Sequence, residues 1–208
     1  MRQTVGAIAV AMLASASPAL AQSQPAADDG WKFFASAYTY VLPDAPNYVQ
    51  PTLTADRKRL HLEARYNYEA QKTGSLWVGY NFSGGETIEW EISPMFGAVF
   101  GETDGVAPGY KGSLDWRRLG LYSESEYVVD TGDTSNSFLY NWSEFTVSPT
   151  DGLRVGLVVQ RTRAYRTDRD VQRGLIVGFS YRRAELTACV FNPDEDKPTF
   201  AFSVGARF

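Results

Sequence analysis

The sequence contains one cysteine, one histidine and, beyond its first 21 residues, no long apolar run. Cys189 has no second cysteine with which to form an intramolecular disulfide, so we expect it to be a small packing residue. Beyond residue 21, no segment approaches the roughly eighteen uninterrupted apolar residues of a transmembrane helix. Zinc-binding Cys/His spacings, a phosphate-binding glycine loop and an EF-hand loop are also missing, and we expect no metal and no cofactor. The formal charge of −4 argues against a nucleic-acid partner.

The first 21 residues have the pattern of a secretory signal peptide. Arg2 provides a positive start, residues 5–16 form an apolar core, and Ala19-Leu20-Ala21 fits a small-x-small cleavage site. The apolar core is too short to cross a bilayer as a helix, although an uncleaved anchor is the alternative. We therefore expect a signal peptide at 1–21, a polar periplasmic leader at 22–30 and a single domain at 31–208.

The domain is rich in two-residue alternation of apolar and polar side chains, the pattern of a strand whose two faces differ. For example, Leu60, Leu62 and Ala64 alternate with His61 and Glu63. Strand-like segments lie at 31–42, 48–54, 58–69, 74–83, 86–101, 109–116, 119–130, 136–148, 152–166, 170–182, 184–192 and 198–208. The pattern predicts an all-β fold of about twelve strands, with ten or fourteen as alternatives, and no helical period interrupts it.

The last segment has the strictest alternation. Phe200, Phe202, Val204, Ala206 and Phe208 form an apolar row, and the residues between them are small or polar. This segment resembles the closing strand of bacterial outer-membrane β-barrels, which typically ends on Phe. The resemblance implies an antiparallel transmembrane β-barrel in the outer membrane, in contact with its lipid. It also implies that the barrel-assembly machinery recognises the C-terminal strand, with Phe208 as the assembly signal.

Other features favour a membrane barrel over a soluble sandwich. Tyr and Trp side chains near the strand ends suit aromatic girdles at two lipid–water interfaces, and these residues are Tyr66, Tyr68, Trp90, Trp116, Tyr127 and Tyr181. A closed barrel leaves no unpaired strand edge in hydrocarbon. An even strand number places both barrel termini on the periplasmic side, where we expect the shorter connections.

Two places in this pattern are irregular. Pro94 falls in the middle of a strand on the apolar face, and because it cannot donate a ladder hydrogen bond we expect a bulge there. The segments at 31–42 and 136–148 do not show which of their faces is apolar. In the second of them we assign Trp142 and Glu144 to the inner face.

The polar rows of the strands predict a charged lumen. The candidate lumen-lining residues are Arg59, His61, Glu63, Arg65, Glu69, Glu89, Glu91, Lys111, Asp115, Glu124, Glu126, Arg154, Glu185 and Arg207, accompanied by Tyr122, Gln160 and Gln172. One interpretation is a ladder of salt bridges that fills a narrow interior. The other is a polar passage that favours cations, because acidic residues predominate and rings of Asp and Glu attract cations.

Catalysis is a third, remote interpretation. Twelve-stranded outer-membrane phospholipases carry a Ser/His/Asn set on their lipid-facing side. His61 instead falls on the polar row with Glu63, and no serine lies two residues away in that arrangement. We therefore predict that the protein is not an enzyme and has no catalytic residues.

Five arginines cluster around one predicted outer hairpin: Arg161, Arg163, Arg166, Arg169 and Arg173. Guanidinium groups at that level suit bidentate binding of lipopolysaccharide phosphates, and ordinary rim charge is the alternative. With its strand number and charged lumen, the chain resembles the monomeric oligosaccharide channels of Gram-negative bacteria. The sequence thus favours a narrow passive channel for small polar solutes or ions, with a closed structural barrel as the alternative.

Overall fold

The computed structural model describes residues 30–161 and 171–208. The predicted signal peptide, nearly all of the leader, and Arg163, Arg166 and Arg169 lie outside the described residues. Within the described ranges, no helix has both the length and the apolarity needed to cross a membrane.

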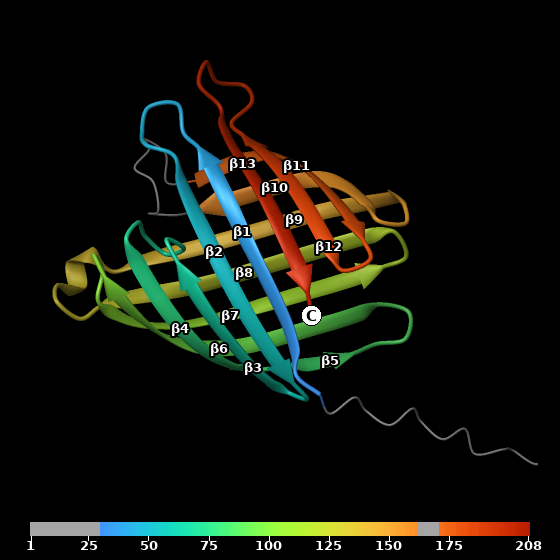
Figure 1. Ribbon diagram of the computed structural model, residues 1–208, viewed down its shortest axis with the longest axis horizontal. Helices are drawn as coiled ribbons and strands as arrows, with labels where there is room; N and C mark the ends of the chain where they lie inside the picture. The colour runs from blue at the N-terminus through green and yellow to red at the C-terminus, as the bar shows by residue number, and fades with distance from the viewer. Residues whose placement is uncertain (1–29, 162–170) are drawn as a thin grey trace, which may run out of the picture.

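One antiparallel sheet contains all the strands (Figure 1). In chain order they are β1 (Lys32–Val41), β2 (Tyr48–Arg57), β3 (Leu60–Tyr66), β4 (Thr73–Tyr80), β5 (Phe82–Gly84), β6 (Glu89–Gly101), β7 (Gly105–Trp116), β8 (Leu119–Asp130), β9 (Phe138–Thr150), β10 (Leu153–Arg161), β11 (Val171–Tyr181), β12 (Ala184–Phe191) and β13 (Thr199–Arg207). A single 3-10 turn, η1 (Thr134–Asn136), lies between β8 and β9.

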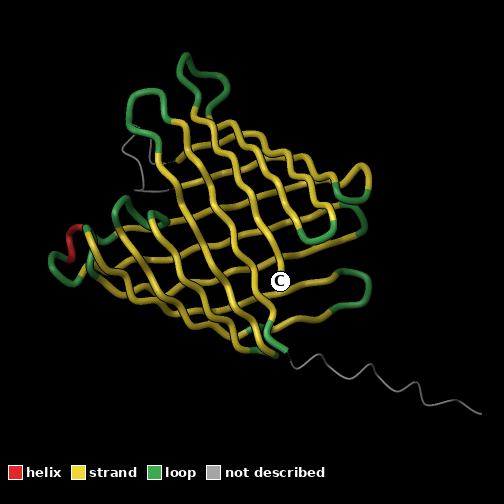
Figure 2. The backbone as a smooth tube through the Cα atoms, in the orientation of Figure 1, coloured by secondary structure: helices red, strands yellow, loops and turns green. Residues whose placement is uncertain are grey.

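The sheet closes on itself into a barrel. Consecutive strands pair with each other except β4 and β5, which both pair with β6, and β1 pairs with β13. β4 and β5 continue in one register against β6 and form a single spanning strand that is interrupted at Asn81. The result is the predicted transmembrane antiparallel barrel of twelve strands. In Figure 2 the strands of the front wall cross those of the rear wall at a large angle, as expected for strongly tilted barrel strands.

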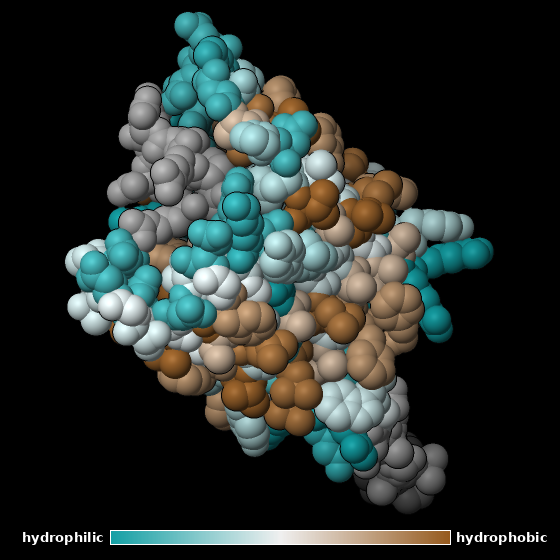
Figure 3. Space-filling view, turned by 60° about the vertical axis from the view of Figure 1, so that its left-hand side comes forward, coloured by the Kyte–Doolittle hydropathy of each residue, from teal (hydrophilic) through white to brown (hydrophobic). Residues whose placement is uncertain are grey.

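The alternation seen in the sequence separates an apolar outer face from a polar inner face. Leu76, Phe96 and Val204 point outward and are 58%, 52% and 57% exposed. Figure 3 shows apolar side chains over the middle of the wall and polar ones toward its ends. In water such a belt would cost about 25 cal/mol per Å² of apolar surface, whereas lipid chains accept it.

The two ends of the barrel differ in the length of their connections. At the short-turn end the connections are 58–59, 85–88, 117–118, 151–152 and 182–183, and the described connections at the long-loop end are 42–47, 67–72, 102–104, 131–137 and 192–198. Lys58, Arg117 and Arg182 have positive φ angles of 56°, 56° and 55° at the tips of two-residue turns. The connections sort to the two ends as the sequence predicts, and β1 begins and β13 ends at the short-turn end.

Two local predictions are wrong. No bulge forms at Pro94, because the register of β6 against β7 continues through it; the irregularity is instead the break at Asn81 in the strand on the other side. Tyr68 does not belong to the outer aromatic girdle. β3 ends at Tyr66, and Asn67 adopts a left-handed φ of 56°, which ends the alternation. Tyr68 therefore turns inward and packs against Tyr140, with ring centroids 5.0 Å apart.

The loops of the long-loop end are tied down by polar contacts. Lys197 lies 2.6 Å from Asp44, and Arg173 lies 2.9 Å from Asp194. In the loop that carries η1, the amide and hydroxyl of Ser135 donate to Asp133, and these hydrogen bonds lower the pKa of Asp133.

Candidate functional site

The lumen of the barrel brings most of the predicted polar residues together. The predicted lumen residues that are buried are His61, Glu63, Arg65, Glu69, Glu124 and Glu126, with Gln160 and Gln172, whereas Lys111, Tyr122 and Arg154 are half-buried. Trp142 and Glu144 also point inward and are 5% and 7% exposed. Strand alternation places all of these side chains inside, apart from Glu69, which reaches the lumen from the loop after β3.

A group of ionic side chains spans the lumen. We call Glu63, Arg65, Lys111, Glu124 and Glu126 the charged cluster. Arg65 on β3 donates to Glu126 on β8 over 2.7 Å, although β4, β6 and β7 separate these strands along the wall. Lys111 on β7 lies 2.6 and 2.8 Å from the two carboxylate oxygens of Glu63. These ion pairs cross the bore and join strands that are not neighbours in the wall.

Arg65 is the centre of the charged cluster. Its guanidinium lies 4.3 Å from the ring centroid of Tyr68 and 4.6 Å from that of Trp77. Its side chain also donates to Glu63 over 2.8 Å, and Glu69 lies 3.5 Å away. A cation held over aromatic faces and surrounded by carboxylates is well compensated inside the barrel.

Acidic residues outnumber bases in the described lumen. The carboxylates are Asp56, Glu63, Glu69, Glu124, Glu126 and Glu144, and the permanent cations are Arg65, Lys111 and Arg154. Glu69 Oε2 and Glu126 Oε1 are buried and accept no hydrogen bond. An excess of carboxylates over permanent cations is the feature that attracts cations in channel interiors.

A second ion pair joins Arg154 on β10 to Glu144 on the adjacent strand β9. Arg154 also donates to the hydroxyl of Thr187 over 3.2 Å, and Trp142 Nε1 donates to Glu144 over 2.8 Å. Gly178 leaves room for this arrangement, because a Cβ at that position would lie 2.5 Å from Arg154 Nε. The absence of a side chain at residue 178 thus lets the guanidinium group lie flat on the barrel wall.

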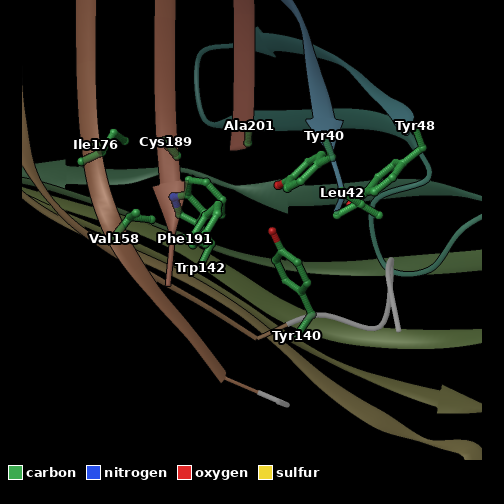
Figure 4. Close-up of a cluster of buried hydrophobic side chains, with 10 residues drawn as sticks. All are labelled: Tyr40, Leu42, Tyr48, Tyr140, Trp142, Val158, Ile176, Cys189, Phe191 and Ala201. Atoms are coloured by element: carbon green, nitrogen blue, oxygen red, sulfur yellow. The ribbon is translucent and has the colours of Figure 1, made fainter. Parts of the chain in front are cut away.

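The long-loop half of the lumen is filled by apolar and aromatic side chains. We call Tyr40, Tyr48, Tyr140, Trp142 and Phe191 the aromatic cluster (Figure 4). Tyr40 stacks on Tyr48 with centroids 4.8 Å apart, and Trp142 meets Phe191 edge-on at 5.8 Å. Figure 4 shows the hydroxyl groups of Tyr40 and Tyr140 pointing into the space between the two walls.

A cavity of about 160 Å³ lies next to both clusters. Its lining on β1 and β2 combines three short side chains with larger ones, namely Ser36, Thr52 and Thr54 with Phe34, Tyr38, Tyr40 and Gln50. Lys111 and Glu124 face them from β7 and β8. The cavity has polar partners on two walls and is large enough for several water molecules, at about 30 Å³ each.

Five predicted lumen residues lie at the short-turn end, outside the buried interior. Glu89, Glu91 and Asp115 are exposed and line a shallow hollow of about 390 Å³. Glu185 pairs with Arg207 at the same end. These positions have the parity of the inner face, but they lie beyond the level at which the bore encloses side chains.

Arg59 also departs from its predicted position. It lies in the turn after β2 and leans over the outward-facing ring of Tyr80, 5.8 Å from the centroid, so it does not face the lumen. Residues in two-residue turns leave the strand alternation, which explains this difference.

His61 has the environment of a structural residue. Its Nδ1 lies 2.8 Å from Asp56 and its Nε2 lies 3.2 Å from Glu63, so both ring nitrogens face carboxylates. It is 7% exposed and lies inside the barrel. The arrangement contains no nucleophile next to the imidazole and does not face lipid. No group of three or more His, Cys, Asp or Glu side chains in residues 30–161 and 171–208 is placed to hold a metal ion.

The arginines predicted to contact lipopolysaccharide are only partly described. Arg161 is the half-buried last residue of β10, and Arg173 is exposed near the start of β11 at the long-loop end. Phe208, the predicted assembly signal, is 66% exposed, and its backbone N–H donates to the carbonyl of Phe33 over 2.9 Å at the seam between β1 and β13.

Sequence reasoning did not identify Asp56, Tyr38 or Tyr40 as lumen residues. The strands predicted at 48–54 and 58–69 leave Asp56 in the turn between them, whereas β2 continues to Arg57. Tyr38 and Tyr40 face inward while small residues such as Ala35 and Ala37 face lipid, which reverses the usual polarity of the pattern. Tyr38 and Tyr40 lie two residues apart in β1, so the sequence shows that they share one face of the strand. It does not show that this face is the inner one.

The closed strand pairing and the apolar belt define the class, an antiparallel transmembrane β-barrel. The chain aligns with the KdgM porin at a TM-score of 0.59 and 11% identity, over 84% of this chain and 99% of that chain. It aligns equally with the KdgM porin in complex with disordered oligogalacturonate, at a TM-score of 0.58, 11% identity and the same coverage. No family profile and no curated protein matches the chain by sequence. The similarity therefore shows a shared fold.

Proposed function

We propose that this protein is a narrow passive channel of the outer membrane for small polar solutes or ions, with a preference for cations. The observation that carries the proposal is the cavity of about 160 Å³, lined by hydroxyls and ionic groups, inside a barrel whose outer face is apolar. Polar groups that line an unfilled cavity in the bore are what the passage of small polar solutes requires. The KdgM porin, which shares the fold, is by its name a channel protein and binds an oligogalacturonate in one of its structures.

Passage along this bore requires charged side chains to exchange partners. Lys111 contacts both Glu63 and Glu124, at 2.6 and 3.6 Å, so a small movement transfers it from one carboxylate to the other. A cation moving through the bore can take the place of the ammonium group at either carboxylate. Anions meet the excess of acidic groups and are disfavoured.

The second candidate is a closed structural barrel. It is favoured by the ion pairs that join opposite walls and by the aromatic cluster that fills the long-loop half. A liposome-swelling assay separates the two candidates. We expect pentose-sized solutes to enter liposomes containing the folded protein faster than trisaccharides do. Absence of swelling with every solute, for protein whose gel mobility shifts on boiling, would favour the closed barrel.

The targeting features belong to the same proposal. To reach the outer membrane, the channel needs cleavage after Ala21 and insertion through the C-terminal strand that ends at Phe208. Contact of Arg161 and Arg173 with lipopolysaccharide then holds it there. N-terminal sequencing of the mature protein should begin at Gln22. A mature chain that begins at Met1 would contradict this part.

A further inference from the structure

Arginines at the short-turn end lie over aromatic rings of the outer wall. Their guanidinium carbons are 5.8 Å from the ring centroid for Arg59 over Tyr80, 5.1 Å for Arg117 over Trp116 and 5.2 Å for Arg182 over Tyr181. The three rings point outward and are 45%, 39% and 61% exposed. We call these three pairs the arginine–aromatic rim.

The rim arginines differ in their partners from three cations at the long-loop end, although Arg207 at the short-turn end also pairs with a carboxylate, that of Glu185. At the long-loop end, Lys72, Arg173 and Lys197 each pair with a carboxylate, at 3.9, 2.9 and 2.6 Å. In the part of the chain that the structure describes, Arg59, Arg117 and Arg182 form no ion pair. The rings beneath them satisfy one face of each guanidinium. Arg59 also donates to the hydroxyl of Tyr80 over 3.3 Å, and its other N–H groups keep their capacity to bind an anion.

The position of the rim identifies the level at which that anion lies. Tyr and Trp rings at the edge of the apolar belt mark the boundary between hydrocarbon and headgroups. A guanidinium above such a ring is at headgroup level, where the phosphodiester of a phospholipid is the available anion. Arg binds phosphate oxygens bidentately, and its flat cation tolerates partial desolvation.

One part of the rim also has room for a headgroup. Arg117 and Arg118 line a hollow of about 530 Å³ together with Ser148, Thr150, Asp151 and Gly152. Arg118 is held in place because it donates to the carbonyls of Ser148 and Pro149 over 2.8 and 3.0 Å. The hollow therefore combines two guanidinium groups with two hydroxyl groups, against one carboxylate.

We propose that the short-turn end of the barrel binds the phosphate groups of anionic phospholipids through Arg59, Arg117 and Arg182 on their aromatic supports. The proposal needs the transmembrane barrel but not a conducting lumen, so failure of the proposed channel function would not contradict it. It assigns an acidic-lipid site to the end opposite the predicted lipopolysaccharide contacts.

The test uses the full mature chain folded into vesicles of phosphatidylcholine with increasing amounts of brominated phosphatidylglycerol. Quenching of tryptophan fluorescence gives the relative association constant of the two lipids, because Trp31, Trp90 and Trp116 lie on the outer wall. We expect phosphatidylglycerol to be preferred. The triple variant R59Q/R117Q/R182Q should lose at least about fivefold of that preference, since each basic residue near an anionic surface contributes on the order of 1 kcal/mol, which is a factor of about five.

The matched control removes three cations from the opposite end, in K72Q/R173Q/K197Q, and should keep the wild-type preference. If the triple rim variant kept the wild-type preference, or the control lost as much, the proposal would be overturned. Inorganic phosphate at 10 mM should leave the preference unchanged, and its loss would indicate a free-phosphate site and contradict the lipid site. If the triple variant fails to show heat-modifiable migration, R117Q and R182Q are measured as single variants. Retention of the wild-type lipid preference by both of them would overturn the proposal.

Discussion

The charged cluster and the aromatic cluster both bridge the barrel, but they do so by different physical means. Arg65 and Lys111 join walls through ion pairs that have alternative partners within 4 Å. Tyr40, Trp142 and Phe191 join walls through close packing of rigid rings, with little exposure to solvent. Ion pairs with several partners within reach can exchange them, whereas packed rings have one good arrangement. For the proposed channel, the comparison assigns stabilisation of the barrel to the aromatic cluster and control of passage to the charged cluster.

The largest expected effect is on stability, from removing a ring of the aromatic cluster. Phe191→Ala should lower the free energy of unfolding by about 3–5 kcal/mol, because Phe191 is fully buried and a cavity replaces it. Urea unfolding of the protein in lipid vesicles measures this. Phe179→Ala, on the adjacent strand but 50% exposed on the outer face, should cost clearly less. Equal losses for the two variants would break the distinction between packed and lipid-facing rings.

The next effect concerns the charged cluster. Arg65→Gln should raise single-channel conductance and increase cation selectivity, because it removes a bulky cation that spans the bore and frees Glu63 and Glu126. We expect a loss of about 1–3 kcal/mol in stability from the unpaired buried groups. Conductance and reversal potential in planar bilayers give the first result, and urea unfolding the second. A lower conductance would contradict the assigned role of Arg65.

A smaller effect compares two pairs of acids of similar spacing. E124Q/E126Q should reduce the cation preference, because both carboxylates lie in the bore. E89Q/E91Q should leave it nearly unchanged, because those side chains are exposed at the short-turn end. The reversal potential in a tenfold salt gradient measures both variants. An equal shift for the two pairs would place the selective region at the rim and contradict the position of the charged cluster.

The smallest effect compares two inward-facing glycines. An added Cβ would lie 2.5 Å from the Trp77 ring at Gly97 and 2.5 Å from Arg154 Nε at Gly178. Gly97→Ala should cost about 1–3 kcal/mol through overpacking against a rigid ring. Gly178→Ala should cost less than about 1 kcal/mol, since the flexible Arg154 can move aside. A larger loss at Gly178, measured by urea unfolding, would show that the charged side chains are as constrained as the rings.

Much of the fold follows from the sequence because strand alternation is a local property. Each of the twelve predicted segments overlaps a strand of the barrel. The break in alternation at Asn67 comes from one backbone angle that the sequence does not specify. The site is less predictable. Alternation shows which face a side chain occupies but not its height along the bore. Glu89 and Glu124 therefore appeared equivalent, although one is exposed at an end and the other is buried.

The contacts that join opposite walls were beyond sequence reasoning for the same reason. Arg65 and Glu126 are 61 residues apart and meet only because of strand tilt and closure. Tyr38 and Tyr40 were missed because β1 carries its aromatic residues inside, where they meet Trp142 and Tyr48. Closure of the barrel, which no single segment encodes, determines these contacts.

The most direct test is the electrical behaviour of the purified mature protein in a planar lipid bilayer. The proposed channel predicts discrete current steps at high salt and, in a salt gradient, a reversal potential that shows preference for cations. A folded, heat-modifiable protein that inserts and gives no steps would contradict the channel and leave the closed barrel.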